Sequence, residues 1–175
     1  MRRLILLRHA KSDWSYPGKP DHDRPLNDRG RAAAPRVGQY MVDHHLVPDR
    51  AMVSSSVRTR QTYRLVAEAF ARPLKETIEP RIYEAEANTL LEVIRETPAN
   101  IHTLLLVGHN PGLHDLALAL VGAGESDARR RLREKMPTGA LAAIDFTIDD
   151  WREIRAGTGR LDRFVTARAL AEPED

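Results

Sequence analysis

Three short apolar runs, each followed at once by polar side chains, organise this sequence. Leu4–Leu7 is long enough for a buried strand and too short for a core helix, and residues 51–53 and 103–107 are interpreted as two further apolar strands. Segments with apolar residues at helical spacing lie between these runs. Strands that alternate with helices in this way predict a layered α/β fold.

The helical patterns and the turn residues predict the remaining elements. Helices are expected over residues 28–45, 57–70, 89–96 and 112–121. A long loop rich in Pro, Gly and Asp is expected over residues 13–27. Residues 140–146 and 151–155 are expected to pair as a hairpin, with Asp149-Asp150 at its turn. Residues 122–124 are interpreted as a turn, because they do not follow a strand as a dinucleotide-binding loop would.

Length and composition limit the class of protein. The 175 residues predict a single domain, residues 1–175. The absence of cysteine excludes disulfides and a thiol nucleophile. No segment has the length of a signal peptide core or of a transmembrane helix, so we expect a cytoplasmic protein without membrane contact. A net charge of +2 is too balanced to indicate nucleic-acid binding.

Two charged segments lie outside the three apolar runs. The basic run over residues 129–135 is either a solvated helix end or loop, or a docking patch for an acidic partner. The last residues, 172–175, are expected to form a polar tail.

The three runs end in side chains of one chemical character. Arg8-His9 follows the first run, Ser54 follows the second with Arg58 in the next helical turn, and Gly108-His109 follows the third. If the strands are parallel neighbours, these groups meet at the carboxyl edge of the sheet, where ligands bind in open α/β folds. Arginines, histidines and helix N-termini together predict an anion site, most simply for phosphate.

The residues around these strand ends resemble the motifs of the histidine phosphatase (phosphoglycerate mutase-like) superfamily. Residues 8–15, Arg-His-Ala-Lys-Ser-Asp-Trp-Ser, resemble the family signature Arg-His-Gly-Glu-Ser-Glu-Trp-Asn. Residues 25–30 resemble the motif that opens the first helix, and residues 54–62 resemble Ser-x-x-x-Arg-x-x-Gln-Thr. Residues 107–109 resemble the second-histidine motif, and residues 21–26 resemble the small SixA-type phosphohistidine phosphatase branch.

The resemblance implies a fold. It implies a three-layer α/β sandwich with a mostly parallel central sheet, helices on both faces and no large cap insertion. Glu84 and His109 are only 25 positions apart, so the site is expected to be shallow and open.

The resemblance also implies a role for each site residue. His9 would be the nucleophile, and Arg8, Arg58 and His109 would hold the phosphoryl oxygens. Ser15 stands where mutases of the family carry an Asn that contacts phosphate. Glu84 would be the general acid, and its alternative interpretation is a solvated glutamate. No metal and no cofactor are expected, while a phosphate or sulfate ion is expected to bind at the site.

The leading functional hypothesis is a phosphatase that removes the phosphoryl group from phosphohistidine on a signalling protein, by way of a phosphohistidine intermediate. A small-molecule phosphomonoesterase of broad specificity is the alternative enzyme. A module that binds phosphohistidine without turnover is the alternative of another class.

Overall fold

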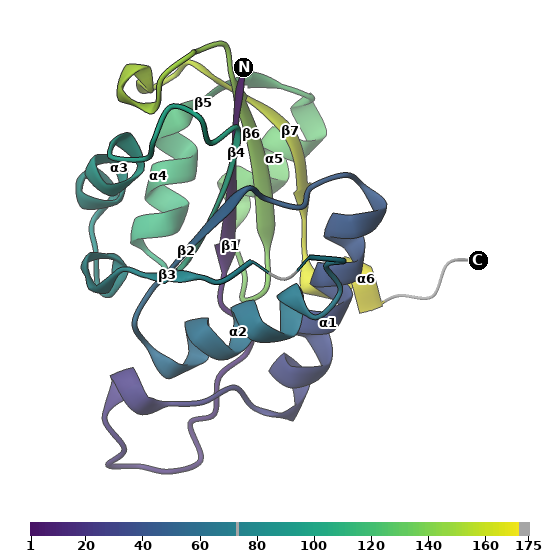
Figure 1. The fold of residues 1–175 in the computed structure, drawn as a ribbon. Helices are drawn as coiled ribbons and strands as arrows, with labels where there is room; N and C mark the ends of the chain where they lie inside the picture. The colour runs from purple at the N-terminus through teal and green to yellow at the C-terminus, as the bar shows by residue number, and fades with distance from the viewer. Residues whose placement is uncertain (73, 172–175) are drawn as a thin grey trace.

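A seven-stranded sheet forms the centre of the computed structural model, which describes residues 1–72 and 74–171 (Figure 1). The strand order is β3-β2-β4-β1-β6-β7-β5. The strands are β1 (Arg2–Arg8), β2 (Arg50–Val53), β3 (Thr77–Ile78), β4 (Thr103–Gly108), β5 (Val121–Gly124), β6 (Leu141–Phe146) and β7 (Gly159–Val165). In this described part of the chain β6 is antiparallel to both neighbours, and every other adjacent pair is parallel. The predicted α/β fold with a mostly parallel sheet is confirmed.

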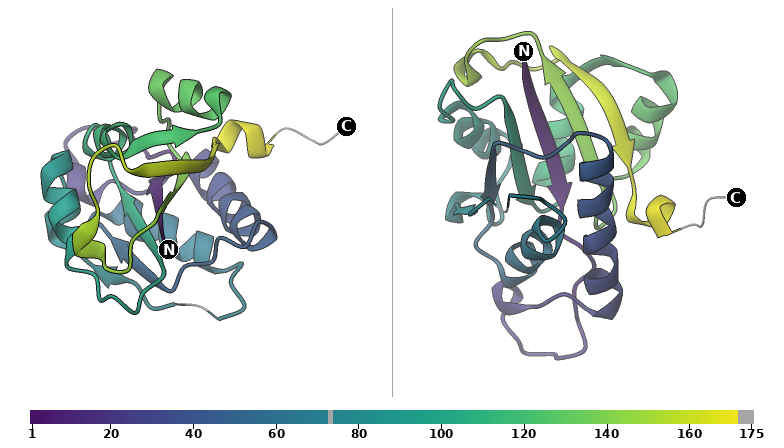
Figure 2. Two further views of the ribbon diagram at one scale, coloured as in Figure 1. Left: turned by 90° about the horizontal axis from the view of Figure 1, so that it is seen from above. Right: turned by 45° about the vertical axis from the view of Figure 1, so that its right-hand side comes forward.

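Helices cover both faces of the sheet (Figures 1 and 2). They are α1 (Asp28–Asp43), α2 (Val57–Ala67), α3 (Ala87–Arg95), α4 (Gly112–Leu120), α5 (Ser126–Glu134) and α6 (Ala167–Ala171). Successive residues of β1 point to opposite faces. Ile5 and Leu7 pack in the cluster formed with α1 and α2, whereas Leu4 and Leu6 pack in the cluster formed with α3, α4 and α5. The apolar run is therefore continuous because the strand is buried on both sides.

The three strands of the apolar runs are neighbours and end at the same level. Leu7 of β1 and Val53 of β2 both pair with Val107 of β4, which lies between them. The residues that follow these three, Arg8, Ser54 and Gly108, therefore lie in one row at the carboxyl edge of the sheet. The loop between β1 and α1 projects beyond the same edge (Figure 1).

The predicted hairpin is wrong in its second strand. β6 is present, but the strand after it that pairs with it is β7, while residues 151–153 form a short 3-10 turn. Trp151 and Ile154 are buried at a spacing of three residues, which suits such a turn better than a strand.

The turn predicted over residues 122–124 is also wrong, because these residues belong to β5. A Cβ atom on Gly122 would lie 2.0 Å from the carbonyl oxygen of Gly157. Glycine is needed there for close approach of two backbones rather than for a reversal of the chain.

The remaining sequence predictions concern the basic run, membrane-spanning helices and the end of the chain. The basic run lies on α5 and just beyond it. None of the helices in the described ranges is long and apolar enough to cross a membrane. The predicted polar tail at residues 172–175 lies outside the described residues.

Candidate active site

His9 occupies the first position after β1 and is 6% exposed. Its Nδ1 atom lies 2.7 Å from the carbonyl oxygen of Ala10. Because a carbonyl can only accept, Nδ1 carries the proton and donates it to this bond, so the neutral ring keeps its lone pair on Nε2. The backbone N–H of His9 donates to Gly108 of β4 at 3.1 Å, which fixes the residue to the sheet edge.

Two arginines flank this histidine. Arg8 donates from Nη1 to the carbonyl oxygen of Met136 at 3.1 Å, and its buried Nε has no protein partner among the described residues. Arg58, in the first turn of α2, is 7% exposed. Burial, together with the neighbouring charge of Arg58, lowers the pKa of Arg8 below its usual value. The pair therefore concentrates positive charge in a poorly hydrated place, where an anion is stabilised.

His109 follows β4, and its ring centroid lies 5.4 Å from that of His9. Its Nδ1 is 3.3 Å from Nη2 of Arg58, and its Nε2 is 2.7 Å from Oγ of Ser54. Since guanidinium can only donate, Nδ1 accepts and Nε2 carries the proton, which is donated to the serine. Ser54 thus sets the orientation of the second histidine.

Both histidines are neutral in the free site. Burial lowers the pKa of His9 to about 4, although its bond to Ala10 acts in the opposite direction. Burial, followed by the proximity of His9 and Arg58, lowers the pKa of His109 to about 3. A neutral His9 is the form that can act as a nucleophile.

Asp21, in the 3-10 turn Asp21–Asp23, holds Arg58 from the other side. Its carboxylate accepts from Nη2 at 3.0 Å and its backbone carbonyl accepts from Nη1 at 2.8 Å. The hydroxyl of Tyr83 donates to the same carboxylate. Burial opposes ionisation of Asp21, but the hydrogen bonds from Tyr83 and Arg58 hold its pKa below the usual range. Burial and the nearby Asp21 raise the pKa of Tyr83 to about 12.

Gln61 and Thr62 of α2 tie the loop after β1 to the helix that carries Arg58. Thr62 accepts from the backbone N–H of Ala10 at 3.0 Å and donates to the carbonyl oxygen of Arg58 at 2.7 Å. Gln61 accepts from the backbone N–H of Leu26 at 2.8 Å. The Gln-Thr pair of the sequence motif is therefore explained by backbone anchoring.

A cleft of about 450 Å³ opens above these groups. Its lining residues are Arg8, His9, Lys11, Ser12, Trp14, Asp21, Arg58, His109, Asn110 and Thr138. Four of the residues predicted from the sequence, Arg8, His9, Arg58 and His109, are thus brought together. Arg60 is half-buried and does not line the cleft.

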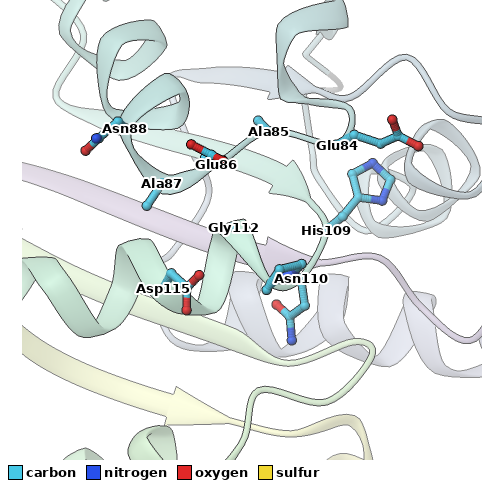
Figure 3. Close-up of a pocket in the computed structure, with 10 residues that line it drawn as sticks. Glu84, Ala85, Glu86, Ala87, Asn88, His109, Asn110, Gly112 and Asp115 are labelled. Carbon is cyan, nitrogen blue, oxygen red and sulfur yellow. The ribbon is translucent and has the colours of Figure 1, made fainter.

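The structure places Ser15 and Glu84 differently from these four. Ser15 is exposed, and both its N–H and its hydroxyl donate to Asp13. Glu84 lines an adjoining cavity of about 570 Å³, which shares His109 and Asn110 with the cleft. Figure 3 shows Glu84 and His109 among the residues that line this cavity. Glu84 is exposed and has a φ of 57°, a conformation that is uncommon for a residue other than glycine.

Sequence reasoning gave no role to the residues that orient the site. Ser54 was visible only as the end of a strand, and Asp21 and Tyr83 are far from Arg58 in the sequence. Their bonds depend on tertiary structure, and the resemblance of residues 21–26 to the SixA-type branch was the available signal for Asp21.

The basic run does not line the cleft. Arg130 pairs with Asp127 and Glu134, and Arg131 pairs with Asp127. Arg129 and Arg133 line a separate cavity together with Leu118, Val121 and Leu132. Among the described residues no group of three or more His, Cys, Asp and Glu side chains is placed to hold a metal ion.

Comparisons with known proteins identify the family. The model of the histidine phosphatase superfamily (branch 1) matches residues 4–102. The uncharacterized protein Rv1276c of Mycobacterium tuberculosis is 34% identical over 165 residues, which are 93% of this chain and 100% of that protein.

Solved structures show the same fold. One from Agrobacterium tumefaciens, to which phosphohistidine phosphatase (SixA) activity is ascribed, is 31% identical. It has a TM-score of 0.78, covering 94% of this chain and 98% of that one. A second structure ascribed to SixA, from Nakamurella multipartitia, is 26% identical with a TM-score of 0.81 and covers 94% and 95% of the two chains.

The chain belongs to the histidine phosphatase superfamily. Within it, the chain is a phosphatase of the small SixA type, with no large insertion between Glu84 and His109.

Proposed function

We propose that this phosphatase removes the phosphoryl group from phosphohistidine on a cytoplasmic signalling protein, with His9 as its nucleophile. One observation carries the proposal. The buried, neutral ring of His9 donates from Nδ1 to Ala10 and keeps the lone pair of Nε2, in a cleft flanked by Arg8 and Arg58. A nucleophile beside two guanidinium groups suits attack on a phosphoryl group.

The reaction takes two steps. Nε2 of His9 attacks phosphorus as the bond between phosphorus and the leaving nitrogen breaks, and the electron pair of that bond stays on the departing imidazole. The phosphoryl group is then bound to His9. Water then attacks phosphorus of this intermediate and passes a proton to solvent. The bond between phosphorus and Nε2 breaks with its electron pair returning to Nε2, so inorganic phosphate leaves and the neutral histidine is restored.

The charged neighbours stabilise the phosphoryl oxygens in both steps. Arg8 and Arg58 supply N–H donors in fixed positions, which is the largest contribution to many phosphoryl transfers. Burial, followed by His9 and Arg58, keeps His109 neutral in the free site, and the negative charge of bound phosphate opposes this, so that Nδ1 can take up a proton and donate it to a phosphoryl oxygen in place of accepting from Arg58. Glu84, which lines the adjoining cavity together with His109, is the proposed general acid for leaving groups that need one.

The openness of the site supports a protein substrate. One helix and one strand, α3 and β4, fill the chain between Glu84 and His109. A shallow cleft admits a side chain carried on another protein more readily than it encloses a metabolite. The two structural neighbours ascribed to SixA support phosphohistidine as the substrate class.

The test compares substrates and traps the intermediate. Wild-type protein should release phosphate from a phosphohistidine protein faster than from p-nitrophenyl phosphate, and acid-labile phosphate should be trapped on it. His9→Ala should show neither turnover nor labelling, while its circular dichroism stays unchanged. Near-normal activity of His9→Ala would refute the covalent mechanism. Preference for the ester would favour the phosphomonoesterase, and binding without turnover would favour the binding module.

A further inference from the structure

Two aromatic side chains of the loop between β1 and α1 are strongly exposed. Trp14 is 63% exposed and Tyr16 is 64% exposed, and in the described part of the chain they are the exposed members of the aromatic residues Phe, Trp and Tyr. Trp14 lines the phosphate cleft together with His9 and Arg58, whereas Tyr16 does not. The loop therefore presents one large aromatic ring at the mouth of the cleft.

Trp14 is fixed although it is exposed. Its Nε1 donates to Oγ of Ser12 at 3.0 Å. Ser12 is buried, and its backbone forms an isolated antiparallel β-bridge with Leu26. The guanidinium of Arg24 lies 4.1 Å from the centre of the indole ring and covers one face. Since most of the side chain remains exposed, the opposite face is open. An indole held from one face and one edge is ready to bind a second flat group.

The phosphoryl group and the indole define what that flat group can be. A ring bonded to a phosphoryl group in the cleft would lie at the mouth, where Trp14 forms the wall. Aromatic rings stack on indole, and a cation is favoured over the face of tryptophan more than over other aromatic rings. The imidazole of phosphohistidine is flat, and it is cationic when its second nitrogen is protonated, which is the form that leaves most easily.

We infer that Trp14, backed by Arg24, forms a ring-binding subsite for the leaving imidazole of the substrate. The inference rests on the proposed function, because it assigns the place of the leaving group in that reaction. The subsite lowers the free energy of the complex with a ring-bearing phosphoramidate relative to one without a ring. Trp14 is thus a specificity-determining residue for phosphorylated imidazoles.

Two small substrates isolate the contribution of the ring. Phosphoimidazole and phosphoramidate both carry a phosphorus–nitrogen bond, but only the first carries a ring. Trp14→Leu should lower the ratio of kcat/KM for phosphoimidazole to that for phosphoramidate about tenfold, or about 1.4 kcal/mol. Trp14→Phe should restore most of the ratio, and Tyr16→Leu, an equally exposed aromatic outside the cleft, should leave it unchanged.

Fluorescence gives a readout that does not depend on turnover. Trp151, the other tryptophan, is fully buried, so changes in the accessible emission report Trp14. In His9→Ala, which does not turn substrate over, saturating phosphoimidazole should quench this emission and saturating inorganic phosphate should not.

The outcomes separate the inference from the proposed function. An unchanged ratio in Trp14→Leu, or no quenching by phosphoimidazole in His9→Ala, would overturn the subsite while leaving the phosphatase reaction intact. Wild-type protein that hydrolyses p-nitrophenyl phosphate but neither phosphorus–nitrogen compound would overturn the proposed function, and the subsite for imidazole with it.

Discussion

The carboxylate of Asp21 lies 3.0 Å from Nη2 of Arg58, so the arginine of the phosphate site is already paired before an anion binds. The backbone carbonyl of Asp21 holds Nη1 of the same guanidinium. This arrangement fixes the direction of the arginine, and it also places a negative charge beside the site of a negatively charged ligand. Asp21 therefore weakens the binding of phosphate while it fixes the orientation of Arg58.

Removing that charge should strengthen phosphate binding. Asp21→Asn keeps the backbone bond but removes a repulsion of about 1 kcal/mol, so the inhibition constant of inorganic phosphate should fall about fivefold. The value of kcat should fall, because Arg58 is held less firmly. Asp23→Asn is the control, because Asp23 belongs to the same 3-10 turn but does not line the cleft. Weaker phosphate inhibition in Asp21→Asn would show that orientation outweighs charge.

Arg58 and Arg60 offer a matched pair of arginines on α2. Arg58→Ala should lower kcat about 10²–10³-fold, as the loss of a strong oxyanion donor does. Arg60→Ala should have little effect, because Arg60 does not line the cleft. Steady-state kinetics on one substrate will compare the two variants. If Arg60 is the sensitive position, the assignment of the phosphate-binding arginine is wrong.

The sheet and the four groups at its edge could be predicted because their signals are local. A buried parallel strand produces a continuous apolar run, and the residue after it lies at the sheet edge whatever the rest of the chain does. β7 gave no such signal. Leu161 and Phe164 are both buried, but the register of β7 shifts against β6, and the regular alternation of a strand is lost.

The orientation of the site could not be predicted, since it depends on contacts between distant segments. The bond from Tyr83 to Asp21 joins residues 62 positions apart, and the bond from His109 to Ser54 joins residues 55 positions apart. For Ser15 the motif was misleading. A phosphate-binding role was predicted from alignment with the family signature, but in the structure the Ser15 hydroxyl donates to Asp13.

Thr62 should matter for both stability and rate. Thr62→Val preserves the shape of the side chain but leaves the buried N–H of Ala10 without its partner, at a cost of about 1–3 kcal/mol. The midpoint of thermal unfolding should fall by several degrees, and kcat should fall because both His9 and Arg58 lose an anchor. Thr97→Val is the matched control, because the buried hydroxyl of Thr97 has no partner in the described structure. Equal effects of the two variants would contradict the anchoring role.

The two buried histidines should make the protein less stable in mild acid. The pKa of each is about 6.5 in the unfolded chain, but about 4 for His9 and about 3 for His109 in the folded chain. Between pH 6.5 and these values the unfolded chain binds more protons, so the free energy of unfolding falls as pH falls through this window. Urea denaturation at pH 6.5, 5.5 and 4.5 should show a smaller loss in His109→Gln. The surface variant His44→Gln is the control, and a slope equal to that of the wild type in His109→Gln would contradict the prediction.

Glu84 should distinguish between substrates by their leaving groups. An alkoxide oxygen needs a proton as it leaves, so Glu84→Gln should lower kcat on an alkyl phosphate about 10²–10⁴-fold if Glu84 is the general acid. The nitrogen of phosphohistidine needs less help, and the loss on that substrate should be much smaller. Glu86→Gln, in the same cavity, is the control. Equal large losses on both substrates would make Glu84 a positioning residue. No loss on either substrate would show that Glu84 is a solvated surface residue. Asp21, which lines the cleft, would then be the next carboxylate to test.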